Sequence, residues 1–317
     1  MKTKVLFVMA CLTVLGMKQA NAQVAKVALS HNGNITMYNA EELQTAIDAS
    51  VDGDTLFLNE GTFSSTKDVN ISKKISLIGA GENTIVSNNI VISTKGVLTS
   101  IMLDGMTIIR TISVSYSVDN LIIRKCKFWG FNCPNSSTYK LNKLTIDRCN
   151  INIPDSYYSS YDFEISSSLK NAIIKNTIIG TIVNHSSNIP TNVSDVTFVN
   201  CNVGFGTRQI KAQFINCLVL NNGDYAADSY FINCCLAYNY STKHIENCTI
   251  NNSGFKTKYE MEEWSSDLLG QDGTPVGITG GTTPYTLIPT SPKMESYSLN
   301  VDSQKRKLNV NIKMTAN

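Results

Sequence analysis

The sequence predicts an all-β protein built as a stacked solenoid of short parallel strands, that is, a parallel β-helix. Three observations carry this prediction: a short phrase that recurs, apolar residues that alternate on both sides of it, and an Asn at a fixed place within it. The phrase is an apolar residue, any residue, Asn and then Cys, as in Phe198–Cys201 and Phe214–Cys217. Short repeats with strand-like patterning are typical of solenoids.

Eight copies of the phrase run along the chain, and four of them are degenerate. Their fourth positions are separated by 20, 23, 28, 24, 16, 17 and 14 residues. These fourth positions are Met106, Cys126, Cys149, Thr177, Cys201, Cys217, Cys234 and Cys248. With the strands that precede the first copy, the stretch from near residue 54 to residue 255 predicts about 8–10 coils. An all-helical solenoid is excluded, because the repeats are too short for helix pairs and alternate with period 2.

The alternation slips by one residue at the Asn. Before it, Val196 and Phe198 share a face, and after it Cys201 and Val203 do. Such a slip would point the apolar side chains after the Asn outward. A corner in the chain at the Asn points them inward again, and Asn suits a corner because it enters the left-handed region more readily than other non-Gly residues. Each copy therefore predicts two short strands that meet at a corner. Five successive Asn corners, at 176, 200, 216, 233 and 247, predict a ladder of amide-to-amide hydrogen bonds.

Residues 1–22 predict a secretory signal peptide. Lys2 and Lys4 form the charged start, residues 5–17 are apolar, and 20–22 are small residues suited to cleavage. An apolar stretch of 13 residues is too short to span a bilayer. A lipoprotein anchored through Cys11 is the less favoured alternative, because only six apolar residues would precede that Cys. We therefore expect an exported protein, in the periplasm, at the cell surface or outside the cell.

Removal of the signal peptide would leave 24 basic and 25 acidic residues, a net charge of −1. This balance argues against a nucleic-acid partner. No further apolar run is long enough for a transmembrane span. The partners that remain are a polysaccharide or a surface protein.

Eight cysteines would remain after export, which ordinarily indicates disulfides. Six of them occupy the same inward position of the repeat, so their side chains point the same way. This geometry suits disulfide bonds poorly, and a ladder of buried free thiols is therefore favoured. No metal site is expected, because the sequence has no Cys-x-x-Cys and no His close enough to complete a zinc set.

The first coil is preceded by a short predicted helix over Asn39–Ala49. Asn39 and Glu42 have the spacing of a capping box, and the helix is expected to plug the open end of the solenoid. The strands that follow are expected at 54–58, 61–63, 69–71, 75–78 and 84–86, with a turn at 79–81.

This opening resembles the N-terminal stretch of pectinesterases and many pectate-lyase-like β-helices. The shared features are the helix, the Gly-Asp strand at 53–58, Gly-Thr-Phe at 61–63, and the strands at 74–79 and 84–86. The resemblance covers residues 38 to 90 for these features and extends to about residue 255 for the coil pattern. It implies the right-handed form of the parallel β-helix and is weak evidence for an activity.

The sequence divides after the last repeat. Residues 23–255 predict the β-helix with its cap, 256–292 a short helix over Glu260–Leu269 and a wrapping linker, and 293–317 a β-hairpin with its turn at Ser303–Arg306. Residues 277–285 resemble the closing segment of exported bacterial β-helix proteins of unknown role.

Catalytic signatures of β-helix enzymes are absent from the sequence: the polygalacturonase set and the later pectinesterase segments are missing. Between the apolar residue and the corner, successive repeats carry Asp104, Arg124, Asp147 and Lys175, which predicts an ion-pair ladder. A catalytic Arg124 or Lys175 beside Asp147 is the alternative, and calcium would be a cofactor only in that lyase case. No other cofactor is expected.

Three further groups of residues are candidate sites. His244 and Glu246 lie two apart with Tyr230 one repeat earlier, which could position a general base. Aromatic residues in the longest gap between repeats suit a sugar-binding loop: Tyr157, Tyr158, Tyr161 and Asp162. The outward position becomes apolar at Val199, Ile215 and Ile232, a stripe that the chain from Thr257 onward is expected to cover.

The favoured function is therefore a non-catalytic exported protein that binds a glycan or a protein partner on its solenoid face. The alternative is a polysaccharide lyase or glycoside hydrolase that acts on an acidic polysaccharide.

Overall fold

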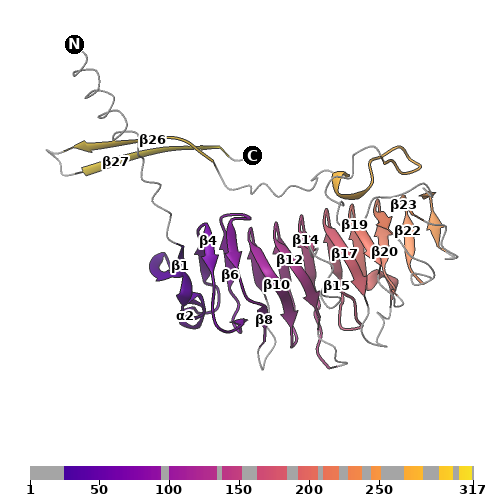
Figure 1. Cartoon of the computed structure of the whole chain (residues 1–317), viewed down its shortest axis with the longest axis horizontal. Helices are drawn as coiled ribbons and strands as arrows, with labels where there is room; N and C mark the ends of the chain where they lie inside the picture. The colour runs from indigo at the N-terminus through magenta and orange to yellow at the C-terminus, as the bar shows by residue number, and fades with distance from the viewer. Residues whose placement is uncertain are drawn as a thin grey trace, which may run out of the picture.

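The structure, a computed structural model, describes residues 25–93, 100–133, 138–151, 163–183, 192–205, 210–220, 228–237, 244–250, 268–280, 293–302 and 307–315. Almost all of the regular structure in these residues is β, and most strands lie side by side in two long sheets of 12 and 13 strands. Figure 1 shows these strands arranged along the long axis of the molecule in the order of the chain.

The 12-stranded sheet runs in the following order: β2 (Asn34–Asn39), β1 (Lys26–His31), β3 (Thr55–Leu58), β6 (Ser76–Gly79), β9 (Ile101–Asp104), β11 (Leu121–Arg124), β13 (Leu144–Asp147), β16 (Ala172–Lys175), β18 (Val196–Val199), β20 (Gln213–Ile215), β22 (Tyr230–Ile232) and β24 (Ile245–Glu246).

The 13-stranded sheet runs in the order β4 (Gly61–Phe63), β7 (Thr84–Val86), β10 (Thr107–Val114), β12 (Lys127–Asn132), β14 (Asn150–Ile151), β17 (Ile178–Val183), β19 (Asn202–Phe205), β21 (Leu218–Leu220), β23 (Cys235–Leu236) and β25 (Thr249–Ile250). Beside this path lie β5 (Val69–Ile71), β8 (Ile90–Ile92) and β15 (Phe163–Glu164).

From β3 onward the chain alternates between the two sheets and moves one place along at each return. In both sheets, each of these strands pairs in parallel with its counterpart in the next repeat, as Leu121 of β11 does with Leu144 of β13 in the 12-stranded sheet. The 12-stranded sheet without its antiparallel strands β1 and β2 has ten strands, one for each repeat. This arrangement is compatible with a β-helix-like solenoid.

The corner between the two strands of a repeat has a left-handed backbone, as the sequence predicts. The φ angles at the third position of the phrase lie between 46° and 66°. The residues at this position are Gly105, Lys125, Arg148, Asn176, Asn200, Asn216, Asn233 and Asn247. Lys125 and Arg148 adopt this strained conformation without the usual Asn or Gly, so the stacking of neighbouring repeats holds them there.

The core is a column of stacked side chains between the two sheets. Phe198, Phe214 and Phe231 are fully buried, and their rings stack with centroids 4.8 and 5.1 Å apart. All eight cysteines of the described residues are buried and form no disulfide with one another. Burial removes the solvation of the thiolate and raises the pKa of Cys126 to about 12. Most of these cysteines therefore serve as apolar packing residues of the central core, and Cys235 packs in a second apolar cluster.

The N-terminal cap contains the predicted helix and one element that the sequence analysis missed. The predicted helix is a 3-10 turn, η1 (Ala40–Glu42), followed by α2 (Leu43–Ala49), whose apolar face is buried in the core. The backbone N–H of Asn39 donates to Glu42 Oε2 at 2.8 Å. The missed element is the antiparallel hairpin of β1 and β2, which adds two strands to the end of the sheet.

The segment 268–280, which we name the strap, packs across the corners of the later repeats. Leu268, Val276 and Ile278 lie against an outward apolar cluster of the 13-stranded sheet, which consists of Ile178, Leu218, Leu220 and Cys235. The predicted helix over Glu260–Leu269 is wrong at its end, because Leu269 forms an antiparallel bridge with Pro275; residues 260–267 lie outside the described residues.

The strap also changes the predicted Asn ladder. Asn233 donates to Asn216 Oδ1 at 2.8 Å, as a ladder requires. Asn176 instead donates to the carbonyl of Gly280 at 3.1 Å. The N–H of Ile278 donates to Asn202 Oδ1 at 3.2 Å. The amides near the corners therefore bind the strap as well as one another.

The predicted C-terminal hairpin is present as β26 (Lys293–Asp302) and β27 (Lys307–Thr315), which pair antiparallel with each other. Its predicted turn lies outside the described residues. No helix in the described part of the chain is long and apolar enough to cross a membrane.

Candidate functional site

One outward column runs the length of the 12-stranded sheet. Parallel pairing places one residue from each of ten successive strands directly beside the next. From β3 to β24 the column reads Phe57, Ile78, Asp104, Arg124, Asp147, Lys175, Val199, Ile215, Ile232 and Glu246. The structure thus brings into one row the charged candidates, the apolar stripe and Glu246, which come from separate repeats.

The central part of the column is an ion-pair ladder. Arg124 Nη2 lies 2.7 Å from Asp104 Oδ2, and Lys175 Nζ lies 3.8 Å from Asp147 Oδ2. The ladder is not saturated: Asp104 Oδ1, Arg124 Nε and Asp147 Oδ1 are buried without a hydrogen-bond partner. These candidate residues are therefore together, with polar atoms still able to accept or donate.

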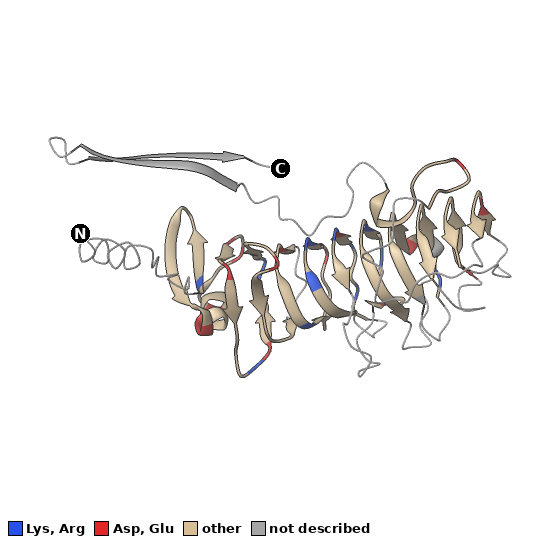
Figure 2. Cartoon of the chain, turned by 45° about the horizontal axis from the view of Figure 1, so that its top comes forward, with Lys and Arg blue, Asp and Glu red and all other residues tan. Residues whose placement is uncertain are grey.

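Two corner residues that were not predicted from the sequence enlarge this cluster. Arg148 Nη2 lies 3.0 Å from Asp147 Oδ2. Burial and the nearby charge of Arg148 lower the pKa of the Lys125 ammonium. With Arg124 and Lys175 the cluster has four basic groups and two acidic ones, Asp104 and Asp147, and basic residues are gathered along the middle of the molecule (Figure 2). The sequence signal for Lys125 and Arg148 is that they occupy the corner position of degenerate repeats, where the other repeats have Asn or Gly.

The second candidate group lies at the far end of the same sheet. The rings of Tyr230 and His244 are tilted against each other with centroids 4.1 Å apart. With Ile232, Glu246 and the backbone of the two strands they line a shallow hollow of about 380 Å³. His244 and Glu246 are exposed, and Tyr230 is 37% exposed. The residues predicted to meet here do so, and the hollow has an aromatic wall beside a carboxylate.

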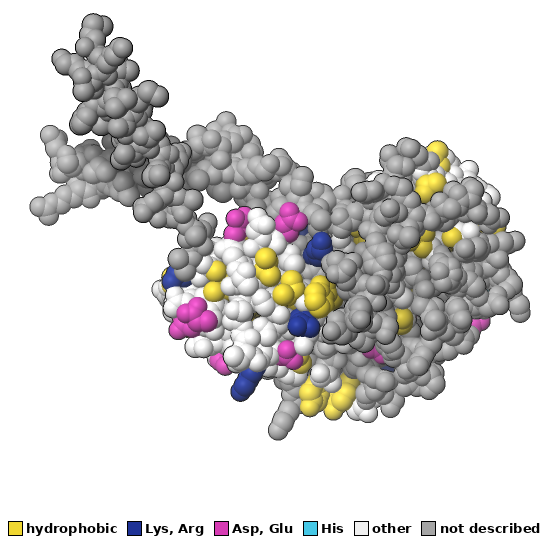
Figure 3. Space-filling model, in the orientation of Figure 1, with side chains coloured by type: hydrophobic (Ala, Val, Ile, Leu, Met, Phe, Trp, Pro, Cys, Tyr) yellow, Lys and Arg dark blue, Asp and Glu magenta, His cyan; other side chains and the backbone are white. Residues whose placement is uncertain are grey.

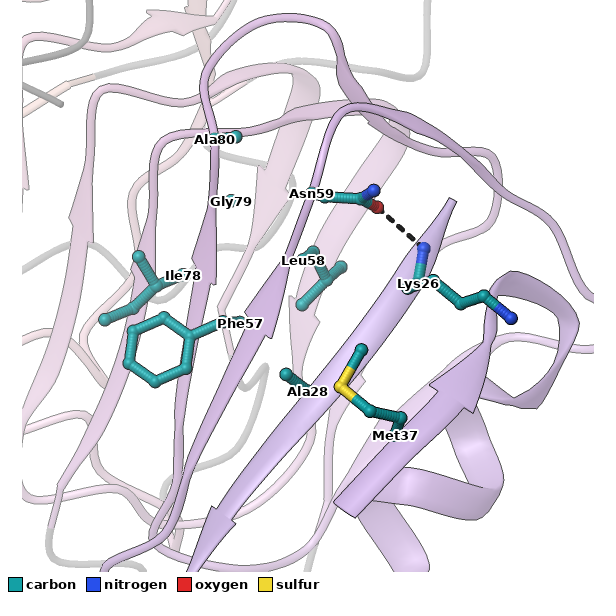
Figure 4. Close-up of a pocket in the computed structure, with 9 residues that line it drawn as sticks. All are labelled: Lys26, Ala28, Met37, Phe57, Leu58, Asn59, Ile78, Gly79 and Ala80. Atoms are coloured by element: carbon teal, nitrogen blue, oxygen red, sulfur yellow. Dashed lines mark hydrogen bonds between the residues drawn. The ribbon is translucent and has the colours of Figure 1, made fainter. Parts of the chain in front are cut away.

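A second hollow, at the N-terminal end of the sheet, was not predicted. It has a volume of about 520 Å³ and an apolar floor formed by Met37, Phe57 and Ile78, with Asn59 and Lys26 at its edge. Figure 4 shows Phe57 beside Ile78 on one side and Met37 beside Ala28 on the other, with the N–H of Lys26 donating to Asn59. The hollow depends on the β1–β2 hairpin, so it could not be found without that element.

The predicted apolar stripe is present and half-buried: Val199, Ile215 and Ile232 lie side by side on β18, β20 and β22. The strap, the part of the tail whose side chains are described, packs on the other sheet. Coverage of the stripe by the rest of the chain from Thr257 onward stays a prediction. The aromatic loop candidates Tyr157, Tyr158, Tyr161 and Asp162 lie outside the described residues.

The outer faces of the two sheets differ in how they are covered. The strap buries the later part of the 13-stranded face. Figure 3 shows hydrophobic side chains gathered near the N-terminal end of the face in view. Ile250 on β25 of the 13-stranded sheet is 42% exposed, but most of the exposed large apolar side chains in the described residues lie on the outer face of the 12-stranded sheet. They are Ile35, Met37, Phe57, Ile173 and Tyr230, which are between 37% and 58% exposed.

Among the described residues, no group of three or more His, Cys, Asp or Glu side chains is placed to hold a metal ion. No protein-family model, no curated protein and no solved structure matches this chain. The resemblance to pectate-lyase-like proteins therefore rests on the sequence features alone.

Proposed function

We propose that this chain is an exported, non-catalytic binding protein built as a right-handed parallel β-helix, and that it binds a glycan or a surface protein on the outer face of the 12-stranded sheet. The observation that supports this proposal is the contrast between the two outer faces. The later part of one is covered by the strap, and the other exposes more of the large apolar side chains, among them Phe57 near one end and Tyr230 near the other. Exposed apolar groups on one face of a soluble protein mark a contact surface.

A glycan fits this surface by its chemistry. Phe57 and Tyr230 offer flat apolar ring faces, and a sugar ring can stack on such a face. Polar side chains lie beside both rings: Asn59 and Lys26 near Phe57, and Glu246 near Tyr230. Hydroxyl groups at the edge of a stacked sugar can exchange hydrogen bonds with them.

Catalysis is the second candidate, and the charged cluster is the observation that favours it. Arg124 lies between Asp104 and Asp147 in the column, and its Nε has no partner. In a polysaccharide lyase or glycoside hydrolase such a group could move a proton or hold a carboxylate of an acidic substrate. The ion pairs within the cluster favour a structural role, because Arg124, Arg148 and Lys175 each already face an aspartate.

A screen separates the two functions. The exported protein is tested for binding on a glycan array and, in parallel, incubated with uronic-acid polysaccharides with and without calcium. Binding without new reducing ends or unsaturated products supports the binding protein. Turnover that Arg124→Ala or Lys175→Ala abolishes supports the enzyme and contradicts the proposal. Capture of a surface protein with no glycan signal assigns the face to a protein partner.

A further inference from the structure

The 12-stranded sheet ends at β2, and on the side away from β1 no described strand pairs with it. Its sequence, Asn-Ile-Thr-Met-Tyr-Asn, contains neither a charged residue nor a proline. Natural sheets usually protect a terminal strand with charges, prolines or a covering segment, because its unpaired backbone can bind another strand. This edge has none of the protective residues.

The direction of the backbone groups of β2 follows from the turn before it. Asn32 and Gly33 have φ angles of 48° and 82°, as in a two-residue type I′ turn, which joins His31 and Asn34 by hydrogen bonding. Bonded residues alternate along an antiparallel pair. Asn34, Thr36 and Tyr38 therefore bond to β1, and Ile35 and Met37 point their N–H and C=O groups to the open edge.

The other side of β1 gives an independent check of this assignment. If His31, Leu29 and Val27 form their backbone hydrogen bonds with β2, then the alternate residues of β1, which include Lys26, must form theirs with β3. The carbonyl of Lys26 accepts from the N–H of Asn59, which directly follows β3, at 3.3 Å. The free donors and acceptors of the edge thus belong to Ile35 and Met37.

The side chains of these two residues lie on the outer face. Ile35 is 57% exposed and Met37 is 58% exposed. Their neighbours Thr36 and Tyr38 stand opposite Leu29 and Val27, which are buried in the core. The open edge therefore combines unpaired backbone groups with exposed apolar side chains at the same two residues.

We propose that β2 pairs antiparallel with β2 of a second copy of this chain, with Thr36 opposite Thr36 of that copy. In this register Ile35 of each chain faces Met37 of the other. Both are edge-facing residues, so each of the two pairs can exchange two backbone hydrogen bonds, and each also brings two apolar side chains together. The contact is self-complementary, as a twofold dimer requires, and joins two 12-stranded sheets into one.

Other registers fit less well. If the twofold axis lies between two residues, each edge-facing residue of one chain stands opposite a residue of the other chain that is already bonded to its own β1. The hydrogen bonds between the two chains are then lost. Centring on Met37 pairs Met37 with its copy and places each Ile35 opposite Asn39, so one apolar pair remains in place of two. A second copy is the occupant that matches the edge in both backbone and side chains, and the absence of charge in β2 means that self-pairing brings no repulsion. This dimer does not rest on the ligand proposed above, although Met37 also lines the hollow beside Phe57.

A charge-swap experiment tests the dimer. The exported full chain is measured by light scattering over a range of concentrations, and we expect its mass to rise toward that of a dimer. Ile35→Lys with Met37→Lys should be monomeric at the same concentrations, as should Ile35→Glu with Met37→Glu. Mixing the two variants should restore the dimer. Val51→Lys, a change at a residue 48% exposed outside β2, is the matched control and should dimerise like the unchanged chain.

A cysteine tests the register. Residues opposite each other at a non-bonded position have Cα atoms about 4.5 Å apart, which is within disulfide range. Thr36→Cys should therefore form a covalent dimer when glutathione disulfide is added as oxidant, and Thr62→Cys, on an exposed position of β4, should not. An unchanged chain that stays monomeric at every concentration overturns the proposal. So does a dimer that survives both charged variants, or a Thr36→Cys chain that cross-links no better than Thr62→Cys.

Discussion

The side-chain amide of Asn233 donates a hydrogen bond to Asn216 Oδ1 at 2.8 Å, although the two residues lie in successive repeats. The same nitrogen lies 2.9 Å from Asp272 Oδ1 and 3.0 Å from Thr274 Oγ1 of the strap. Asn233 also has a φ of 51°. One residue therefore turns the chain, links two repeats and holds the strap.

Substitution of Asn233 should separate these roles. Asn233→Gly keeps the left-handed backbone and loses the hydrogen bonds, so we expect a loss of about 1–2 kcal/mol in the free energy of unfolding. Asn233→Ala also strains the backbone and should cost about 1 kcal/mol more. Urea unfolding measures both. Asn247→Gly, at the same position of the last repeat but on an exposed residue, is the control. Equal stabilities of the Gly and Ala variants would contradict the role of the corner.

The stacked phenylalanines should carry much of the stability of the later repeats. Phe214 is fully buried between Phe198 and Phe231, and Phe214→Ala should lower the free energy of unfolding by about 3–5 kcal/mol. Phe57→Ala, at a ring that is 45% exposed, should cost much less. Thermal and urea unfolding of the two variants give the comparison. A similar cost at both positions would mean that the Phe column is not packed as described.

The pH dependence of stability should depend on Asp54. Burial alone would raise the pKa of this carboxylate, but the N–H of Val51 at 2.8 Å and the ring of His31 at 2.7 Å lower it below the ordinary value of 3.8. A lowered pKa in the folded state stabilises the fold above the unfolded pKa, and the contribution is lost as the pH falls below 3.8 toward the folded pKa. Urea unfolding from pH 6 to pH 3 should show a smaller loss for Asp54→Asn than for the unchanged chain. An unchanged slope would exclude this role.

The repeats could be predicted because each copy carries its own local signal, alternation on both sides of a corner. The columns of charged and apolar residues followed from counting outward positions relative to that corner. The signal for the β1–β2 hairpin is also present, since Asn32 and Gly33 lie between alternating residues. The hollow beside Phe57 could not be predicted without that hairpin.

The position of the strap could not be predicted from a pattern. It has no periodicity, and its contacts join residues as far apart as Asn176 and Gly280, which are 104 positions apart in the sequence. Gly277 shows how specific this contact is. Its φ is 77°, and a Cβ there would meet Asn202 Oδ1 at 2.2 Å. The sequence alone does not show that this position requires glycine, because Asn202 lies beside it only in the folded chain.

Loosening the strap should expose a thiol. Cys235 is 2% exposed, and Val276 and Ile278 belong to the apolar cluster that covers it. Ile278→Ser should weaken this packing, increase the binding of a hydrophobic dye and allow an alkylating reagent to modify Cys235. Cys126, which is fully buried in the central core, is the internal control and should stay unmodified. Peptide mapping by mass spectrometry distinguishes the two. Equal protection of Cys235 from alkylation in the Ile278→Ser variant and in the unchanged chain would contradict the covering role of the strap.

The most direct measurement compares matched substitutions for their effect on the ligand found in the screen. Ile173, on the outer face of the 12-stranded sheet, and Val51, in the loop before β3, are both 48% exposed. If the outer face is the binding surface, Ile173→Ser and Tyr230→Ser should each weaken binding by about tenfold, or about 1.4 kcal/mol, and Val51→Ser should leave the dissociation constant unchanged. Equal binding by all three variants would contradict the assignment of function to this face.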